Sequence, residues 1–270
     1  METKIITSTK NPLIKQIRKL HRHKERQKQN LLLLEGTNLI DAACKVDYEL
    51  DIIFCTDRWR ESHQPLCLTF ANRGSRIVLV SPEVLSAVAT TVNPDGVVAT
   101  APRRVNATPK ISSTNLGLAL ERLQDPGNLG TIIRTAVATG VDSLWLSKES
   151  VDLDNPKVLR ASVGEWFRLS IATQQDLSTV VQQHQQQGVQ VIATISEAAK
   201  NYWELDFNRP SLILLGNEGA GLSTDLIDLA DEKVKIPLSN GVESLNVAIA
   251  TALLLYEAKR QSYEAIGNRQ

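Results

Sequence analysis

Residues 239–260 read SNGVESLNVAIATALLLYEAKR, a polar loop that runs directly into an apolar segment. Apolar residues recur there at helical spacing, namely at Leu245, Ala248, Ile249, Ala252 and Leu253. The pattern predicts a helix with Ser244 at its N-cap. A helix N-terminus presents free backbone N–H groups, here beside Asn240 and Asn246. This arrangement is typical of a small-molecule site, and an ordinary capped core helix has the same pattern.

An earlier segment predicts a strand, a turn and a helix. The strand spans 116–123, Asp125 to Asn128 forms the turn, and the helix runs from Leu129 to Thr139 and stops at Gly140. On such a helix Gly130 and Arg134 share a flank away from the apolar stripe, which leaves room for a substrate backbone beside the arginine. A solvated surface arginine is the alternative interpretation.

Residues 188–195 and 211–218 are nearly continuous apolar runs, which predicts buried strands of a parallel sheet. The second run ends in a glycine-bearing loop, GNEGAG (216–221). Its glycines let a ligand approach the backbone at the edge where open α/β sheets bind ligands, although a tight structural loop uses the same residues. The loop lacks the Gly-Lys-Ser/Thr ending of a Walker motif, and no GxGxxG opens the first strand–helix turn. ATP and NAD are therefore disfavoured as ligands.

Three segments together resemble the motifs of the SpoU (TrmH) RNA ribose methyltransferases: DPGNLGTIIRTA (125–136), ILLGNEGAGLS (213–223) and IPLSNGVESLNVAIATALL (236–254). The resemblance covers about residues 115–260, and the preceding part looks like the substrate-binding domain of the family. It implies an α/β fold whose C-terminal domain is a deep trefoil knot of the SPOUT type, in exception to the rule that chains are unknotted. It also implies S-adenosylmethionine as cofactor and a homodimer whose sites draw on both subunits.

Site residues follow from the resemblance, position by position. Cofactor contacts are implied for Thr194, Gly216, Ile236 and Leu245. Polar site residues are implied at Asn128, Arg134, Glu218, Ser244 and Asn246. Arg134 is the catalytic candidate, placed to engage the ribose 2′-hydroxyl and an adjacent phosphate. Because a guanidinium stays protonated, it suits holding a phosphate and stabilising a forming alkoxide better than it suits the role of general base.

The net charge of zero hides an asymmetry, since residues 1–30 hold nine basic and two acidic residues, a net charge of +7. Lys15, Arg18, Lys19, Arg22 and Arg26 fall three or four apart, whereas Leu13, Ile14, Ile17 and Leu20 line another face. We expect a basic amphipathic helix that contacts RNA phosphates, chiefly through Lys15, Arg18 and Arg22. Membrane-surface binding and solubilisation are the alternatives. Lys157 and Arg160, after Asn155-Pro156, are further RNA candidates or an ordinary surface charge pair.

Length and pattern predict two domains. Residues 1–105 are expected to form the basic helix and a small α/β, ribosomal-protein-like RNA substrate-binding domain. Residues 106–114 would be a linker, and 115–265 the methyltransferase domain. The three cysteines and four histidines lack the spacing of a disulfide framework or a metal site. No apolar run is long enough to span a bilayer and no signal peptide is evident, so we expect a cytoplasmic protein without metal.

The sequence therefore predicts an S-adenosylmethionine-dependent RNA 2′-O-methyltransferase, with ribosomal RNA favoured over transfer RNA because of the separate N-terminal domain. A transfer-RNA enzyme and a non-catalytic RNA-binding or ribosome-assembly protein are the alternatives. A small-molecule methyltransferase fits poorly with the +7 segment. Because aromatic residues make up only 4% of the chain, recognition by phosphate and shape is expected rather than an aromatic stacking platform.

Overall fold

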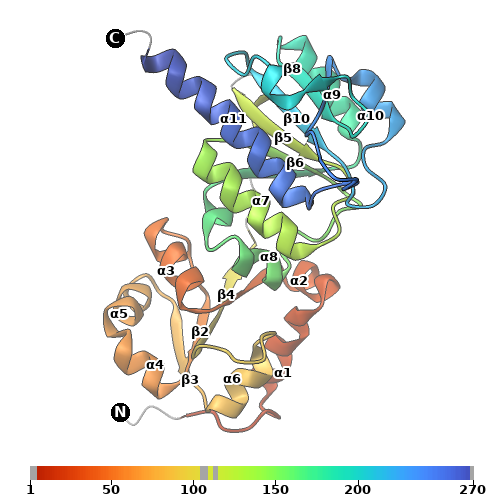
Figure 1. The fold of residues 1–270 in the computed structure, drawn as a ribbon. Helices are drawn as coiled ribbons and strands as arrows, with labels where there is room; N and C mark the ends of the chain where they lie inside the picture. Colours follow the sequence, from red (N-terminus) through yellow and green to blue (C-terminus); the bar gives the residue numbers. More distant parts are fainter. Residues whose placement is uncertain (1–4, 104–108, 112–114, 268–270) are drawn as a thin grey trace. The chain divides into compact units, whose positions relative to one another are not determined.

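A computed structural model describes residues 5–103, 109–111 and 115–267 (Figure 1). The chain divides into two compact units. Unit 1 comprises the described residues of Met1–Val105 together with Asp152–Arg168, and unit 2 comprises those of Asn106–Val151 and Leu169–Gln270. Most of the linker predicted at 106–114 lies outside the described residues. The segment Asp152–Arg168 thus folds with unit 1, although the residues before and after it in the sequence belong to unit 2.

Unit 1 is a four-stranded sheet with helices around it. Its strands are β1 (Leu31–Glu35), β2 (Ile52–Cys55), β3 (Arg76–Leu79) and β4 (Val97–Pro102), in the order β1-β4-β2-β3. Among these four strands, β2 and β3 pair in parallel, and β4 pairs antiparallel with both β1 and β2. Its helices are α1 (Pro12–Arg18), η1 (Lys19–His21), α2 (His23–Gln29), α3 (Thr37–Lys45), α4 (Asp57–Ser62), α5 (Gln64–Asn72), α6 (Pro82–Val88), α8 (Pro156–Ala161) and η3 (Glu165–Phe167). Strands and helices alternate over residues 31–102, in agreement with the small α/β fold expected for this part of the chain.

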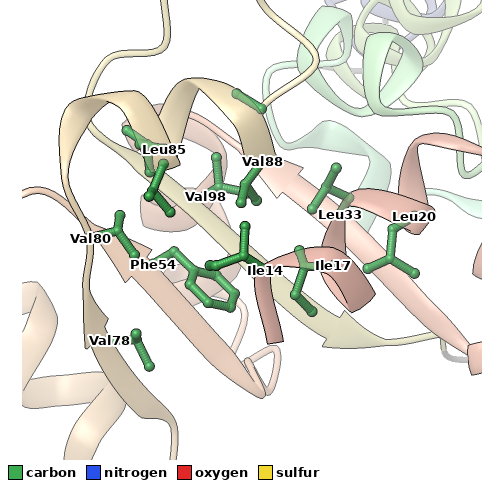
Figure 2. Packing of buried hydrophobic residues seen from close by; sticks show 12 residues of the cluster. Ile14, Ile17, Leu20, Leu33, Phe54, Val78, Val80, Leu85, Val88 and Val98 are labelled. Carbon is green, nitrogen blue, oxygen red and sulfur yellow. The ribbon is translucent and has the colours of Figure 1, made fainter. Parts of the chain in front are cut away.

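The N-terminal helices complete the core of unit 1. Ile14, Ile17 and Leu20 are buried against Leu33 and Phe54 (Figure 2). The predicted apolar face is therefore confirmed, because these side chains recur at helical spacing and find a core to fill. The helix is not continuous, however, since the chain adopts an extended conformation at Arg22 between η1 and α2.

Long-range ion pairs hold the segment 152–168 in unit 1. Arg26, expected on the exposed basic face, is only 2% exposed and is paired with Asp152. Arg103 is paired with Asp154. A buried cation must be matched by an acceptor, and the acceptor here comes from 126 residues further along the chain. The expectation for Arg26 was wrong because helical spacing does not reveal such a partner.

Unit 2 contains a seven-stranded sheet in the order β7-β6-β5-β10-β8-β11-β9, in which every pairing is parallel. The strands are β5 (Leu116–Leu120), β6 (Ser143–Ser147), β7 (Ser170–Gln174), β8 (Gln190–Thr194), β9 (Lys200–Asn201), β10 (Ser211–Leu215) and β11 (Glu232–Lys235). The helices are α7 (Pro126–Thr139), α9 (Leu177–Gln186), η4 (Tyr202–Glu204), α10 (Thr224–Leu229) and α11 (Val247–Gly267). The apolar runs at β8 and β10 are buried strands of a parallel sheet, as predicted.

Helices cover both faces of this sheet. One face packs Trp145, Val191 and Leu212 against α9 and α10. Successive strand residues point to opposite faces, so the equally buried Ile192 and Ile213 lie on the other side. Helices α7 and α11 pack against each other along much of their length (Figure 1).

The structure corrects the start and the buried face of the C-terminal helix. Helix α11 begins at Val247, and its N-cap is Asn246, whose Oδ1 accepts a 2.9 Å hydrogen bond from the N–H of Ala248. Ser244 is therefore not the N-cap. The fully buried stripe contains Thr251, Leu254 and Leu255, whereas Ile249 of the predicted stripe is 54% exposed. Apolar residues occur on both faces of this helix, and only the position of α7 decides which face is covered.

Candidate active site

The carboxyl ends of three neighbouring parallel strands bring together three of the predicted cofactor residues. Thr194 ends β8, Gly216 follows β10 and Ile236 follows β11. Strands β10, β8 and β11 are adjacent in the sheet, so their carboxyl ends lie at one edge. The hydroxyl oxygen of Thr194 is buried and has no hydrogen-bond partner among the described residues. Leu245, the fourth candidate, is 37% exposed in the loop before α11.

Gly216 opens a closed backbone loop. The N–H of Asn217 donates to the Gly221 carbonyl at 3.0 Å, and the Gly221 N–H donates back to the Asn217 carbonyl at 2.9 Å. A Cβ on Gly216 would lie 2.0 Å from the Gly221 carbonyl carbon and 2.1 Å from the Leu222 nitrogen. Glycine is therefore required because the loop folds onto itself, whereas the sequence suggested that it leaves space for a ligand.

Three polar residues from three distant segments form one hydrogen-bond chain. Asn128 Nδ2 donates to Glu218 Oε1 at 3.1 Å, and Asn246 Nδ2 donates to Asn128 Oδ1 at 3.0 Å. Asn128 is fixed by the N-cap of α7, where Asp125 Oδ1 accepts its backbone N–H at 2.8 Å. Helix α7 thus begins at Pro126, so the residues expected to form a turn are its first helical turn. This chain of hydrogen bonds joins the three sequence motifs at one place.

Glu218 is held as an anion. Burial alone would raise its pKa, but hydrogen bonds from its own backbone, the Asn128 side chain and the Asp125 and Gln124 N–H groups outweigh burial and lower the pKa. Both carboxylate oxygens accept hydrogen bonds, from Gln124 and from Asp125 and Asn128. A carboxylate with a lowered pKa and occupied oxygens is a poor general base. The role of Glu218 here is to connect the loop 216–221 to residues 124 and 125 before α7.

Arg134 and Ser244 lie outside this chain of hydrogen bonds. The Arg134 side chain is exposed on α7 and makes no hydrogen bond or ion pair with the described residues. Its guanidinium is therefore available to a polyanionic ligand. Gly130 is buried, so it does not supply the open niche that the helical spacing suggested. Ser244 is exposed in the loop before α11 and has no side-chain hydrogen bond within the described part of the chain.

The residues proposed to bind RNA differ in how free they are. Lys15, Arg18 and Arg22 are exposed and make no ion pair with any residue the structure describes. Lys157 is exposed on α8. Arg160 is held within unit 1, because its Nη1 lies 2.9 Å from Glu35 Oε2 and 2.8 Å from Thr90 Oγ1. Its positive charge is therefore already paired with a nearly buried carboxylate.

Two residues that organise the site, Asn217 and Arg122, were not predicted from the sequence. Asn217 Oδ1 accepts the N–H groups of Gly219 and Ala220, both at 2.9 Å, while its Nδ2 donates to the Arg122 carbonyl at 2.8 Å. Arg122 adopts a left-handed conformation with φ of 52° at the end of β5. Its N–H donates to Ser147 Oγ at 2.8 Å. The asparagine between glycines was a turn signal, but nothing local indicated the strained arginine.

Comparisons with known proteins identify both parts of the chain. The SpoU rRNA Methylase family matches residues 115–256, and the MRM3-like substrate binding domain matches residues 11–99. An uncharacterized tRNA/rRNA methyltransferase of Synechocystis is 46% identical over 260 residues, covering 96% of this chain and 95% of the relative. The 23S rRNA (guanosine(2553)-2′-O)-methyltransferase RlmP of Bacillus subtilis is 34% identical over 256 residues, covering 95% and 99%.

A shorter relative and a solved structure complete the comparison. The tRNA (guanosine(18)-2′-O)-methyltransferase of Escherichia coli is 34% identical over 152 residues, which cover 56% of this chain and 66% of that enzyme. The crystal structure of the AdoMet-bound rRNA methyltransferase from Sinorhizobium meliloti has a TM-score of 0.84 and 32% identity, covering 95% of this chain and 97% of that one. The three motifs, the parallel sheet that places them at one edge and the match over 115–256 lead to one assignment: this chain belongs to the SpoU rRNA methylase family.

Proposed function

We propose that the protein transfers a methyl group from S-adenosylmethionine to a ribose 2′-hydroxyl of ribosomal RNA. The observation that carries the proposal is the hydrogen-bond chain of Glu218, Asn128 and Asn246, which gathers the three motifs beside a guanidinium-bearing helix. The RNA 2′-O-methyltransferase relatives, and a neighbouring structure that binds AdoMet, support the same chemistry.

The residues at the sheet edge fit the cofactor. Adenine and methionine need a cleft with backbone N–H and C=O partners and few charged groups. Thr194, Gly216 and Ile236 follow adjacent strand ends, and the unpartnered Thr194 hydroxyl needs a polar partner. We assign cofactor binding to these residues and to Leu245. The bound cofactor supplies an electrophilic methyl carbon on a sulfonium, which leaves as a neutral thioether when the carbon–oxygen bond forms.

The protein's own contribution is positioning and electrostatics. Arg134 would hold the phosphate next to the target ribose and stabilise the negative charge that develops on the 2′-oxygen as its proton leaves for solvent. Glu218 keeps its charge and fixes Asn128 at the start of α7. This contact positions α7, and with it Arg134 two turns further on, relative to the loop 216–221. Ser244 and Asn246 lie in the loop that joins the cofactor edge to α11.

Ribosomal RNA is favoured over transfer RNA by the extent of the matches. The relatives that match both units include an enzyme of 23S rRNA, whereas the Escherichia coli tRNA enzyme matches 56% of the chain. This chain also matches a separate MRM3-like substrate binding domain over residues 11–99. In that domain Lys15, Arg18 and Arg22 would neutralise RNA phosphates, with Lys157 as a further contact. A ribosomal substrate also agrees with the cytoplasmic location expected from the sequence.

We also propose a knotted methyltransferase domain that works as a homodimer, within the predicted bounds 115–265 but without the segment 152–168, which folds with unit 1. An apolar surface on α11 supports the dimer: Ile249 and Tyr256 are each 54% exposed and line a pocket with Leu253 and Tyr202. Covering such side chains is favourable, and a second copy offers the same surface. Sedimentation of wild type and Ile249→Asp tests this, because a dimer at this face should dissociate in the variant.

Methyl transfer by Arg134 variants tests the function. Arg134→Ala and Arg134→Lys should each lose at least about a hundred-fold in single-turnover transfer of labelled methyl to ribosomal RNA, since lysine lacks the planar fork. Cofactor affinity and the thermal midpoint should stay unchanged because the side chain is exposed. Arg209→Ala, an exposed arginine of unit 2 before β10, is the matched control.

Two results would contradict the assignment. Retention of more than about a tenth of the wild-type rate by either variant would correspond to a loss below about 1.4 kcal/mol, and Arg134 would be an accessory residue. A wild-type protein that binds ribosomal RNA and cofactor but transfers no methyl group would favour the alternative of a non-catalytic assembly protein.

A further inference from the structure

Unit 1 contains a pocket to which neither the three motifs nor the basic helix assigns a role. It has a volume of about 580 Å³ and lies among α4, α6 and the chain between α6 and β4. That volume falls in the range of sites for small organic molecules, roughly 300–1,000 Å³. Its lining combines an aromatic wall, contributed by Trp59 and His63, with a polar rim.

The aromatic wall is rigid. Trp59 and His63 stack with ring centroids 4.5 Å apart and planes 12° apart. Trp59 is 4% exposed, and its Nε1 donates to Thr37 Oγ1 at 2.8 Å. Gly96, with φ of +116°, makes this packing possible, because a Cβ there would lie 2.8 Å from the Trp59 Cβ. The wall therefore needs no rearrangement to receive a ligand.

His63 is the half-buried outer member of the stack. Its Nδ1 lies 2.9 Å from the Trp59 carbonyl oxygen, which fixes the ring and makes Nδ1 the donor. In the neutral ring Nε2 is then the acceptor. One ring face is covered by Trp59, and the residue lines the pocket. A planar group with N–H donors is the ligand that such a surface fits.

The rim carries the charge pattern of a nucleotide site. Arg58 is exposed at the pocket and makes no ion pair with the described residues. Asp95, also in the lining, has a carboxylate that accepts the Thr37 N–H at 2.7 Å. An anion inside the pocket repels a phosphate there and favours a neutral base with N–H groups. Helix α6, which forms one wall, packs against α1, the helix that carries the exposed Lys15 and Arg18.

We propose that this pocket binds one unpaired nucleobase of the RNA substrate, stacked on His63, while Arg58 holds a flanking phosphate. The proposal rests on the proposed function only in taking RNA as the substrate. It adds one stacked base to the recognition by phosphate and shape expected from the low aromatic content. An unpaired base is specified because a paired base cannot leave its helix to enter a walled pocket.

RNA binding by full-length variants tests the pocket, with a single-stranded 12-nucleotide RNA and a fully paired 12-base-pair RNA as probes. His63→Ala should weaken binding of the single strand about ten-fold, the size of effect that loss of one stacking contact produces, and should leave binding of the duplex unchanged. His63→Phe should restore single-strand binding because it keeps the ring. Arg58→Ala should weaken binding of the single strand by a few-fold and reduce its salt dependence. Leu68→Ala, an exposed residue of α5 outside the pocket lining, is the control.

Equal affinities of His63→Ala and wild type for the single strand would overturn the proposal, as would an equal loss for both probes, which would indicate a phosphate contact or a disturbed fold. The thermal midpoint of each variant distinguishes a phosphate contact from a disturbed fold. Because binding is measured without methyl transfer, a wild-type protein that methylates no RNA would refute the proposed function and leave this test intact.

Discussion

A pair of alanine substitutions in one loop gives the sharpest test of how the cofactor edge is built. Gly216 and Gly219 belong to the same GNEGAG segment, and sequence alone treats them alike. At Gly216 a Cβ would lie 2.0 Å from the Gly221 carbonyl carbon, whereas at Gly219 the nearest atom is Asn217 Oδ1 at an ordinary contact distance of 3.6 Å. Gly216→Ala should therefore displace the loop, and Gly219→Ala should not.

The size of the effect follows from the contacts that must break. A Cβ needs about 3.4 Å, so the segment at Gly221 and Leu222 has to move by more than 1 Å. That movement removes the two backbone hydrogen bonds between Asn217 and Gly221, each worth about 0.5–1.5 kcal/mol. Overpacking adds about 1–3 kcal/mol. Gly216→Ala should therefore cost roughly 2–6 kcal/mol locally, and Gly219→Ala under about 1 kcal/mol.

Calorimetric titration with S-adenosylmethionine, alongside urea unfolding, measures both consequences. We expect Gly216→Ala to lose at least about a hundred-fold in cofactor affinity, because a loop shifted by an ångström no longer presents its N–H groups at the strand end. Gly219→Ala should stay within a few-fold of wild type. Wild-type affinity in a folded Gly216→Ala protein would refute the assignment of this loop to the cofactor. Equal losses in both variants would show that backbone freedom, rather than the close contact at Gly216, limits binding.

Three further predictions concern charge. Burial lowers the pKa of His184, and its hydrogen bond to the Val180 carbonyl opposes this shift only in part. On acidification the unfolded chain therefore takes up the proton first, and the free energy of unfolding should fall as pH drops below about 6.5. Urea unfolding at pH 7.5 and pH 5 should show a smaller fall for His184→Phe than for wild type. Arg26→Ala removes the buried partner of Asp152, whose carboxylate keeps its contact with His23 Nδ1 at 2.6 Å, and should cost about 1.5–3 kcal/mol, the size of one hydrogen bond to a charged group. The exposed Arg22→Ala should cost under about 0.5 kcal/mol, and similar losses in the two variants would mean that the buried pair contributes little. Replacing Lys15, Arg18 and Arg22 by glutamine should reduce the slope of log affinity for duplex RNA against log salt by about two to three, without changing cofactor affinity, and an unchanged slope would place these residues away from the RNA.

The sequence by itself determined the elements and the motifs. Strand and helix periodicity located the buried strands β8 and β10 and the apolar face of α1, because the spacing of apolar side chains within one element is a local property. The same holds for the end of α7 at Gly140, which adopts the left-handed conformation that glycine permits. The three motifs were likewise legible as segments, and with them the family and the residues proposed for the cofactor.

The tertiary structure decided which of these residues meet and which faces are covered. Asn246 and Asn128 are 118 positions apart, yet they share a hydrogen bond, because β5 and β11 belong to one parallel sheet whose following loops all lie at the same edge. Arg160 is paired with Glu35, and Arg26 with Asp152. Helical spacing predicted no such partner for either arginine, because it does not reveal acceptors distant in the sequence. Helix α11 buries Leu254 and Leu255 and exposes Ile249 because α7 packs along one of its two apolar faces. Burial and charge pairing depend on neighbours distant in the chain, and no local pattern records which neighbours those will be.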